Sequence, residues 1–365
     1  MNILVTGGFG SIGVLVIEEC QRRGHSVTVF ELATKRTRRL ARKYGRRKVR
    51  AVFGDIRSPE DVNLAVAGQD AVIHMAAILP PTSDRLPELC ERVNVGGTEN
   101  LVAAMREAPR SLAPQESRPA RGNPQPARDA AESVPAWTDA GTRRPVMVYV
   151  SSAGVMGPTQ KRTPPVRPDD PLTPTDIYSR SKIAAESLVS SSGIPWCVLR
   201  LAGVIPTVIN YGSLKTMVKL LFSLPLPARC EMVIDLDVAA ALVSAAENLR
   251  GDAVSAGSIA GRKGFIAGGK CCQVTSRGLI NFMFPPMGLT PPDESLYTAE
   301  IDSYYLDWYD TEEIQAILKY QNHSLQDWLD LMLGKLRWAL PLLRLFRGPI
   351  RKALEKQSPL YRISR

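Results

Sequence analysis

Tyr178 and Lys182 stand four residues apart in the stretch YSRSK. Pro174, Thr175 and Asp176 precede them and predict the start of a helix, on which residues four apart share one face. A lysine ammonium beside a phenol stabilises the phenolate, so we expect Lys182 to lower the pKa of Tyr178 and make it a usable acid and base. Free tyrosine, whose pKa is about 10, would not serve at neutral pH.

A second set of chemically suggestive residues is the glycine run VTGGFGSIG, which holds Gly7, Gly10 and Gly13. A strand-length apolar run precedes it and a helix-period segment follows, which is the context in which glycines bring backbone amides and a helix N-terminus to a pyrophosphate. Glu31 ends the second apolar run, eighteen positions after Gly13. A carboxylate there can bind the adenosine ribose hydroxyls and repels a 2'-phosphate, which favours NAD over NADP.

Ten lysines and arginines lie between Lys35 and Arg50, just beyond Glu31. The formal net charge of the chain is +10; this run contributes +10 and residues 335–365 contribute +8, so the rest of the chain sums to −8 and is acidic. We therefore predict no specific nucleic-acid partner. Either Arg36 or Arg38 reaches a 2'-phosphate, which keeps NADP open, or the run is a solvated helix face, which Glu31 favours.

These residues need a scaffold that brings strand ends together, and the chain predicts one. Short apolar runs alternate with helix-period segments, which indicates an α/β fold with a doubly wound parallel Rossmann sheet and a smaller C-terminal substrate-binding subdomain. We expect a dinucleotide-binding domain over 1–202, a substrate-binding part interleaved with the sheet over 203–333, and a basic amphipathic tail over 334–365. Helices are expected at 11–23, 34–44, 59–67, 87–106, from about 176, at 214–222 and at 237–248.

Six ordered motifs resemble those of a known family: TGGFGSIG near the start, GDI at 54–56, HMAA at 74–77, NVGGTENL at 94–101, VSSAGVMG at 150–157 and YSRSK at 178–182. The sequence is similar to the extended short-chain dehydrogenase/reductases, and within them to the NAD-dependent epimerase/dehydratase family. The resemblance runs from residue 1 to about 335 and is interrupted at 107–145.

The resemblance implies roles for individual residues. Tyr178 would exchange a proton while hydride passes to or from the nicotinamide, Lys182 would hold the nicotinamide ribose, and Ser152 would bind the reacting oxygen, with Ser151 as a structural neighbour. Four of the residues expected to bind the cofactor have an alternative role. Asp55 and Ile56 would instead be helix-capping or core residues, Asn94 would make a structural hydrogen bond, and Val204 would be a core residue. The expected cofactor-binding residues are Gly7, Gly10, Ser11, Ile12, Gly13, Glu31, Asp55, Ile56, Ala76, Ala77, Asn94, Tyr178, Lys182 and Val204.

Two departures bear on the substrate. Met156 stands where the family usually has tyrosine, and CEMVIDLDVA lacks the Arg-Asp-aromatic opening common in nucleotide-sugar members, although it offers Asp237 at the start of a helix. The main hypothesis is an epimerase, dehydratase or oxidoreductase acting at a hydroxyl or carbonyl carbon of a sugar nucleotide or related metabolite. One alternative is a dehydrogenase or reductase of an apolar, steroid- or flavonoid-like alcohol or ketone. Another is a non-catalytic NAD(P)-sensing or assembly protein. The resemblance also implies a homodimer.

The remaining features concern surroundings rather than chemistry. Residues 107–145 are rich in Pro, Ala and Arg and predict a flexible surface insertion. Six cysteines without metal or disulfide spacing and three histidines predict no metal site and a reducing, cytoplasmic setting. We expect no signal peptide and no spanning helix.

The tail mixes arginine and lysine with leucine, tryptophan and phenylalanine over 335–365. Such a segment is typical of peripheral contact with an anionic membrane. Pro341 and Pro349 break any long helix, and the alternative is a segment packed on the domain with its charges in water.

Overall fold

The computed structural model describes residues 1–108, 111–112, 142–208, 218, 221–251, 257–302 and 304–361. Its centre is a seven-stranded sheet in the order β11-β8-β7-β4-β1-β2-β3, in which every pair is parallel. The strand order reverses between β1 and β4, which is the switch point where such sheets bind ligands. This confirms the predicted doubly wound fold. The strands are β1 (Asn2–Thr6), β2 (Ser26–Glu31), β3 (Arg50–Phe53), β4 (Ala71–His74), β7 (Val146–Ser152), β8 (Trp196–Leu201) and β11 (Lys263–Ile266).

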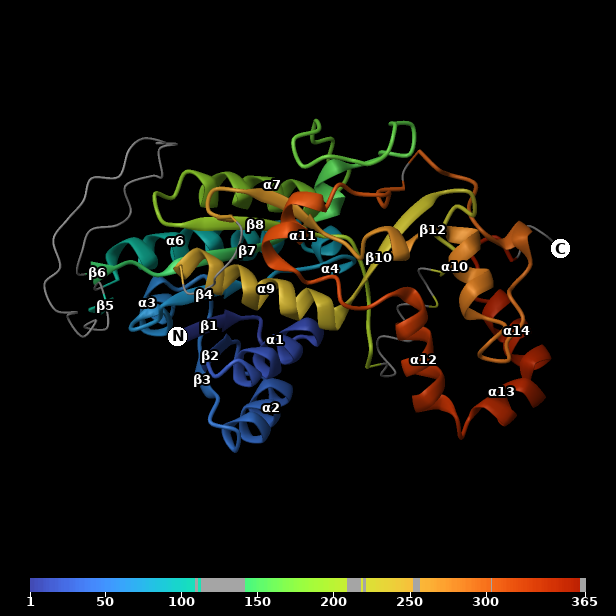
Figure 1. Cartoon of the computed structure of the whole chain (residues 1–365), viewed down its shortest axis with the longest axis horizontal. Helices are drawn as coiled ribbons and strands as arrows, with labels where there is room; N and C mark the ends of the chain where they lie inside the picture. Colours follow the sequence, from blue (N-terminus) through green and yellow to red (C-terminus); the bar gives the residue numbers. More distant parts are fainter. Residues whose placement is uncertain are drawn as a thin grey trace, which may run out of the picture.

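Helices cover both faces of this sheet, because successive strand residues point to opposite sides and are apolar on both. Ile3 and Val5 pack in the core beneath α1 (Ser11–Arg22) and α9 (Asp235–Arg250), whereas Leu4 packs in the core on the other side. That second face is covered by α3 (Pro59–Val66), α6 (Gly97–Glu107) and α7 (Ile177–Ser190). Figure 1 shows α7 and α1 on opposite sides of the sheet.

The predicted helix over 87–106 forms as three consecutive pieces. They are α5 (Pro87–Glu91), the π-helical η1 (Arg92–Gly96) and α6. A short α4 (Thr82–Arg85) precedes them, and α2 (Lys35–Gly45) carries the basic run. A 3-10 turn, η2 (Ala153–Met156), follows β7.

A smaller subdomain is built on a three-stranded sheet in the order β12-β10-β9. Its own core includes Ile205, Leu279, Trp328 and Leu329. The same half of the chain also supplies strand β11 to the main sheet and helix α9 to one of its faces. The subdomain and the main sheet are therefore interleaved in sequence. The subdomain comprises β9 (Gly203–Ile205), β10 (Arg229–Ile234), η3 (Lys270–Cys272), β12 (Gln273–Thr275), α10 (Ser276–Met283), η4 (Glu294–Leu296) and α12 (Leu325–Leu336). Helix α11 (Glu312–Leu318) instead lies against β11 and α9.

The ends of the predicted insertion form a two-stranded antiparallel ribbon, β5 (Ser111–Leu112) with β6 (Thr142–Arg143). Residues 109–110 and 113–141 of that predicted segment, and most of the helix expected at 214–222, lie outside the described residues. The chain continues beyond α12 into α13 (Leu340–Leu345) and α14 (Arg347–Glu355), at the end of the molecule far from β5 and β6 (Figure 1). Among the helices described, none is long and apolar enough to cross a membrane.

Candidate active site

The glycine loop between β1 and α1 is shaped by two positions where only glycine fits. Gly7 has φ +71°, and a Cβ there would lie 2.9 Å from the backbone nitrogen of Ala76. At Gly13 a Cβ would lie 2.5 Å from the carbonyl oxygen of Gly8. Such close approaches exclude any side chain. The loop is therefore pressed against both the start of α1 and the segment after β4.

The N-terminus of α1 is open toward this loop. Gly10 is the N-cap and supplies no side-chain cap, and Ser11 and Ile12 begin the first turn, which holds no acidic residue. Backbone N–H groups of a first helical turn have no partner within the helix and favour an anion. The cradle fits the pyrophosphate of a dinucleotide, with Ser11 exposed and Ile12 half-buried beside it.

Glu31 is held next to the glycine loop at the end of β2. Its Oε1 accepts a hydrogen bond from the N–H of Phe9 at 2.9 Å, and the Phe9 ring is fully buried. Burial raises the pKa of Glu31, while the Phe9 N–H and the nearby Arg36 act in the opposite direction. The half-buried carboxylate is therefore held beside the glycine loop, and its contact with the adenosine ribose stays a prediction.

All ten basic residues from Lys35 to Arg50 are exposed. Near the start of the run, the positive charge of Arg36 acts to lower the pKa of Glu31, and the Arg38 guanidinium lies 5.2 Å from the centre of the Phe53 ring. Further along, Lys43 and Arg47 lie over the Tyr44 ring. These contacts fit the solvated helix face that the sequence favoured.

Asp55 and Ile56 take local roles in the structure. Asp55 forms a turn with Arg57, whose guanidinium and N–H both donate to the carboxylate and hold its pKa below the usual range. Ile56 is buried in the core, and a Cβ at Gly97 would come within 2.8 Å of its side chain. The contacts of Ile56 match the core alternative, and adenine binding by either residue stays a prediction.

The segment after β4 is tied down by two polar side chains. The N–H of Ala76 donates to the Thr6 hydroxyl at 3.2 Å. Asn94 is buried and accepts the N–H of Ile78 at 2.7 Å, while its amide donates to the Ser181 hydroxyl at 2.9 Å. Asn94 thus fixes the half-buried stretch after Ala77 against α7, which is the structural role that the sequence left open. Its contact with a cofactor stays a prediction.

Ser152 and Tyr178 meet at the carboxyl end of β7. Asp176 caps α7 by accepting the N–H of Ser179 at 2.7 Å, which places Tyr178 in the first turn. The Ser152 hydroxyl lies near enough to the Tyr178 phenol to act on its pKa, and its oxygen accepts the N–H of Gly154 at 3.1 Å. The structure therefore brings together a serine and a tyrosine that are distant in sequence.

Lys182 lies one turn further along α7, with a side chain only 3% exposed. Its Nζ donates to the carbonyl oxygen of Val150 at 2.8 Å and lies 4.7 Å from the Tyr149 ring centre and 5.9 Å from that of Tyr178. Burial lowers the pKa of Lys182 to about 8, against the opposing effect of Glu186.

The expected lowering of the Tyr178 pKa is wrong for the protein on its own. Burial raises the pKa of the Tyr178 phenol, and the negative charges of ionised Tyr305 and Asp176 add to the increase. Removing water from a phenol disfavours its charged form, and the nearby Ser152 hydroxyl only partly offsets this. Lys182 directs its ammonium to Val150 instead of to the phenol oxygen.

Two neighbours of the site carried no sequence signal. Tyr305 comes from the segment before α11, and a Cβ at Gly154 would lie 3.8 Å from its ring. Glu186, one turn beyond Lys182, accepts the Ser151 hydroxyl at 2.6 Å and pairs with Arg200 at 2.8 Å. Ser151 therefore faces the structural ion pair, as its expected role as a neighbour implied.

The wall after β8 is apolar. A Cβ at Gly203 would lie 2.9 Å from the sulfur of Met232 and 3.1 Å from Leu306. Val204 is half-buried and packs on the core beneath α9, so its contacts are those of the core alternative, while cofactor contact stays a prediction. Met156 is fully buried, with its sulfur 3.6 Å from Arg200 Nη1.

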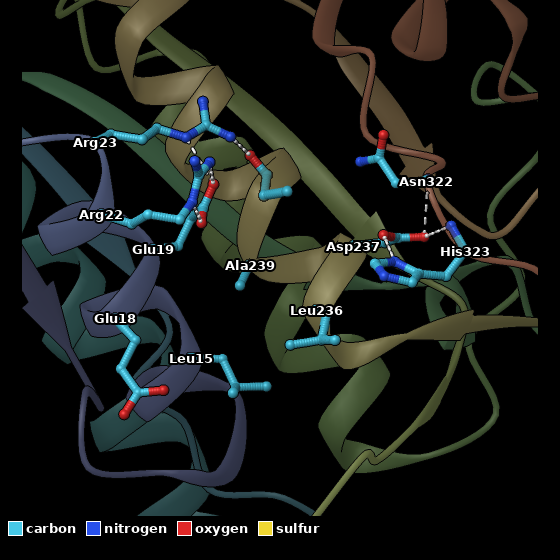
Figure 2. A pocket seen from close by; sticks show the side chains of 11 residues that line it. Leu15, Glu18, Glu19, Arg22, Arg23, Leu236, Asp237, Ala239, Asn322 and His323 are labelled. Carbon is cyan, nitrogen blue, oxygen red and sulfur yellow. Dashed lines mark hydrogen bonds and ion pairs between the residues drawn. The ribbon is translucent and has the colours of Figure 1, made fainter. Parts of the chain in front are cut away.

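A separate pocket of about 390 Å³ lies between α1 and α9 (Figure 2), on the sheet face opposite α7. Its polar groups pair with one another. Glu19 holds Arg22 and Arg23, and Asp237 accepts His323 Nδ1 at 2.6 Å. Asp237 thus ties α9 to the start of α12. No cluster of three or more metal-ligating side chains occurs in the described part of the chain.

Comparison with protein families decides what this arrangement belongs to. Residues 3–207 match the family described as the NAD dependent epimerase/dehydratase family, a span that contains the glycine loop, Ser152, Tyr178 and Lys182. The chain belongs to the NAD dependent epimerase/dehydratase family. NAD is the cofactor that this family's description names, and the glycine cradle and Glu31 fit its pyrophosphate and ribose.

The curated relatives that this chain matches have names that refer to steroids or sterols. The chain is 36% identical over 112 residues to a 3-beta-hydroxysteroid dehydrogenase of Mycolicibacterium neoaurum, covering 29% of each protein. It is 34% identical over 104 residues to human sterol-4-alpha-carboxylate 3-dehydrogenase, decarboxylating, covering 28% of this chain and 25% of that one. It is 30% identical over 194 residues to rat 3 beta-hydroxysteroid dehydrogenase type 7, and the match covers 51% of this chain and 47% of the rat protein. The matches thus span from a quarter to about half of these relatives' length.

Solved structures extend the likeness in fold to nearly the whole chain. UDP-glucose-4-epimerase from Stenotrophomonas maltophila, with bound NAD and formylated UDP-arabinopyranose, has a TM-score of 0.68 at 20% identity, covering 94% of this chain and 99% of that one. A short-chain dehydrogenase/reductase superfamily protein from Agrobacterium tumefaciens with bound NAD has a TM-score of 0.64 at 19% identity, covering 94% and 100%. The epimerase/dehydratase fold therefore includes the C-terminal subdomain.

Proposed function

We propose that the protein is an NAD(P)-dependent oxidoreductase or epimerase/dehydratase of the short-chain dehydrogenase type. It acts at a hydroxyl or carbonyl carbon of a sugar nucleotide or related metabolite. The observation that carries this proposal is the meeting of Ser152 and Tyr178 at the end of β7, with Lys182 buried one turn away and the glycine cradle on a neighbouring strand of the sheet.

NAD, when bound, supplies the acceptor or donor of hydride. Ser152 binds the reacting oxygen and orients it toward the phenol. Tyr178 holds its proton at neutral pH because burial raises its pKa, so it donates that proton to the oxygen in the reducing direction. In the oxidising direction it must first lose that proton to solvent, and as phenolate it then accepts the proton of the substrate hydroxyl. Lys182 keeps a positive charge at neutral pH with a pKa of about 8, and its ammonium donates to the nicotinamide ribose.

A second substrate class is favoured by specific observations. The curated relatives quoted above are named for steroids, and Gly203, Met232 and Leu306 present an apolar wall beyond β8. A steroid-like secondary alcohol would use the same Ser152 and Tyr178 chemistry. In this alternative the apolar wall would contact the substrate rings, whereas a sugar nucleotide would need polar partners for its diphosphate.

The cofactor preference, partners and compartment complete the proposal. Glu31 supports NAD over NADP because a 2'-phosphate would meet its carboxylate. We infer a homodimer from the family resemblance, and a reducing cytoplasm from six free cysteines, five of which are buried.

The function is tested by incubating the purified protein with NAD or NADP and panels of nucleotide sugars and of 3-hydroxysteroids. Absorbance of the reduced cofactor and product masses are followed, because epimerisation is redox-neutral overall. We expect turnover in one panel and a loss of about 10³-fold in kcat/KM for Tyr178→Phe, with NAD affinity kept. Tyr297→Phe, in the separate core cluster that includes Phe222, is the matched control. Retained turnover in Tyr178→Phe would reject the catalytic assignment, and NAD binding without turnover in either panel would favour the sensing alternative.

The adenosine end is tested by binding. Glu31→Ala should weaken NAD by about tenfold, because two ribose hydrogen bonds lose their acceptor, while NADP affinity rises. Glu18→Ala, which removes a carboxylate on the outer surface of α1, should change neither. Calorimetry or fluorescence gives the two dissociation constants, and a wild-type preference for NADP would contradict the expected cofactor.

A further inference from the structure

Large apolar side chains are exposed in one short stretch at the C-terminal end. Within residues 338–346, Trp338 is 74% exposed, Leu345 is 73% exposed, and Leu342 and Phe346 are about half exposed. No residue of α13 or α14 is buried. Single exposed leucines are ordinary on protein surfaces, but a tryptophan, a phenylalanine and two leucines within nine residues form a cluster that soluble surfaces rarely leave in water.

Basic side chains surround this cluster. Residues 335–361, which are the described part of the C-terminal tail, hold seven lysines and arginines and one acidic residue, Glu355. Arg337, Arg344 and Arg347 flank the apolar cluster and are exposed, and none of the three has an ion-pair partner in the described part of the chain. Positive charge interleaved with tryptophan, leucine and phenylalanine matches the interface of an anionic bilayer, where rings lie among headgroups and cations meet lipid phosphates.

The other side of the tail is attached to the body. The Ser358 hydroxyl donates to the carbonyl oxygen of Leu296 at 2.6 Å, and Glu355 accepts the N–H of Asp293 at 3.3 Å. Leu354 packs partly buried on the core cluster that includes Phe222. The tail is therefore held in place by its last turns while Trp338 and Leu345 stay in water, which places it at one end of the molecule (Figure 1).

We propose that the C-terminal tail is a docking surface for an anionic lipid bilayer, which binds it peripherally. The helices α13 and α14 have six and nine residues, too short to span a bilayer but long enough to lie in its interface. A second copy of the chain is a poorer occupant because it would bring seven more cations against seven. The proposal goes beyond the enzymatic function and does not depend on it.

Vesicle flotation with the full chain tests the proposal. Vesicles of phosphatidylcholine alone are compared with vesicles that contain about one third phosphatidylserine. We expect the wild type to float only with the anionic vesicles. Trp338→Ala with Leu345→Ala, and separately Arg337→Gln with Arg347→Gln, should each lower the bound fraction by about tenfold. Leu64→Ala and the pair Arg39→Gln with Arg42→Gln are matched controls, because they remove equally exposed groups elsewhere.

A fluorescence measurement guards against misfolded variants. Anionic vesicles should shift the tryptophan emission of the wild type to shorter wavelength, and Trp338→Phe should abolish that shift without changing NAD binding. The proposal is overturned if the wild type does not float, or if the α2 pair lowers binding as much as the tail pair. It is also overturned if sedimentation shows a dimer that the Trp338 and Leu345 changes dissociate, since a second copy would then be the occupant.

Discussion

Lys182 and Arg200 are two cations buried near the same strands, yet their surroundings differ. Arg200 is 1% exposed, forms two bonds to Glu186 at 2.8 and 3.0 Å, and donates to the carbonyl of Pro168 at 2.7 Å. Lys182 is as deeply buried but has one hydrogen bond, to the Val150 carbonyl, in the part of the chain that the structure describes. Burial without a paired carboxylate lowers the pKa of Lys182 to about 8.

The difference separates a structural ion pair from a group available for chemistry. A buried cation with every donor used stabilises one arrangement and resists titration. A buried ammonium with donors to spare destabilises the fold and can bind whatever oxygen enters beside it. On this basis we propose that Lys182 belongs to the active site, whereas Arg200 belongs to the frame that holds β7, β8 and α7 together.

The largest expected effect is on catalysis. Lys182→Met should lower kcat/KM by 10³- to 10⁴-fold, or about 4–5 kcal/mol, because the buried cation at the site is lost while its volume is kept. The free energy of unfolding should not fall, since a destabilising charge has been removed. Steady-state kinetics with the active substrate panel, and urea titration, measure the two quantities. A variant that unfolds more easily but stays active would reverse the comparison.

Arg200→Met should act in the opposite way. Leaving Glu186 buried without its partner should lower the free energy of unfolding by about 3–5 kcal/mol, as seen by urea titration at pH 7. Adding Glu186→Leu should recover most of that loss, because the isolated carboxylate is then removed. If the double variant is no more stable than Arg200→Met alone, the loss comes from packing of the arginine stem instead of from the unpaired charge.

The sequence predicted what is encoded locally. The glycine loop depends on Gly7 and Gly13, where the backbone turns and approaches neighbouring backbone closely, and on the short strand-loop-helix unit that holds them. Glu31 follows at the end of the next strand. The Tyr178 and Lys182 pairing is likewise set within one turn of α7. Such features need no knowledge of distant segments. The fold class followed from the alternation of strand and helix patterns along the chain, and the family followed from six local motifs in order.

What the sequence missed depends on distant contacts. Tyr305 and Glu186 reach the site by tertiary packing, and no spacing in the chain announces them. The direction of the Tyr178 pKa was wrong for the same reason, because desolvation by the surrounding fold outweighs any pairwise attraction. For Ile56 and Asn94 the motif was found, but only the packing showed which of the two alternative roles their contacts serve.

The pH dependence of stability sharpens the comparison between the two cations. Lys182 has a pKa of about 8 in the fold against an ordinary value of 10.5, so between these values the unfolded chain binds the proton and the folded chain does not. The free energy of unfolding should therefore rise by about 3 kcal/mol from pH 8 to pH 10.5, and the penalty is fully present below pH 8. Urea titrations of wild type and Lys182→Met across this range should differ by that increment. A parallel pair of curves would show that Lys182 is charged at no cost.

The smallest expected effect separates the two adjacent serines. Ser151 donates to the buried Glu186 at 2.6 Å, so Ser151→Ala should lower the free energy of unfolding by about 2 kcal/mol and leave kcat/KM nearly unchanged. Ser152 lies beside the Tyr178 phenol, so Ser152→Ala should lower kcat/KM by about 10²-fold at a smaller cost in stability. Urea titration and kinetics should therefore show the larger loss of stability in Ser151→Ala and the larger loss of kcat/KM in Ser152→Ala. A general loss of packing would lower both quantities together in each variant. If Ser151→Ala loses activity as strongly as Ser152→Ala, the ion pair of Arg200 and Glu186 positions the catalytic residues, and frame and site are energetically coupled.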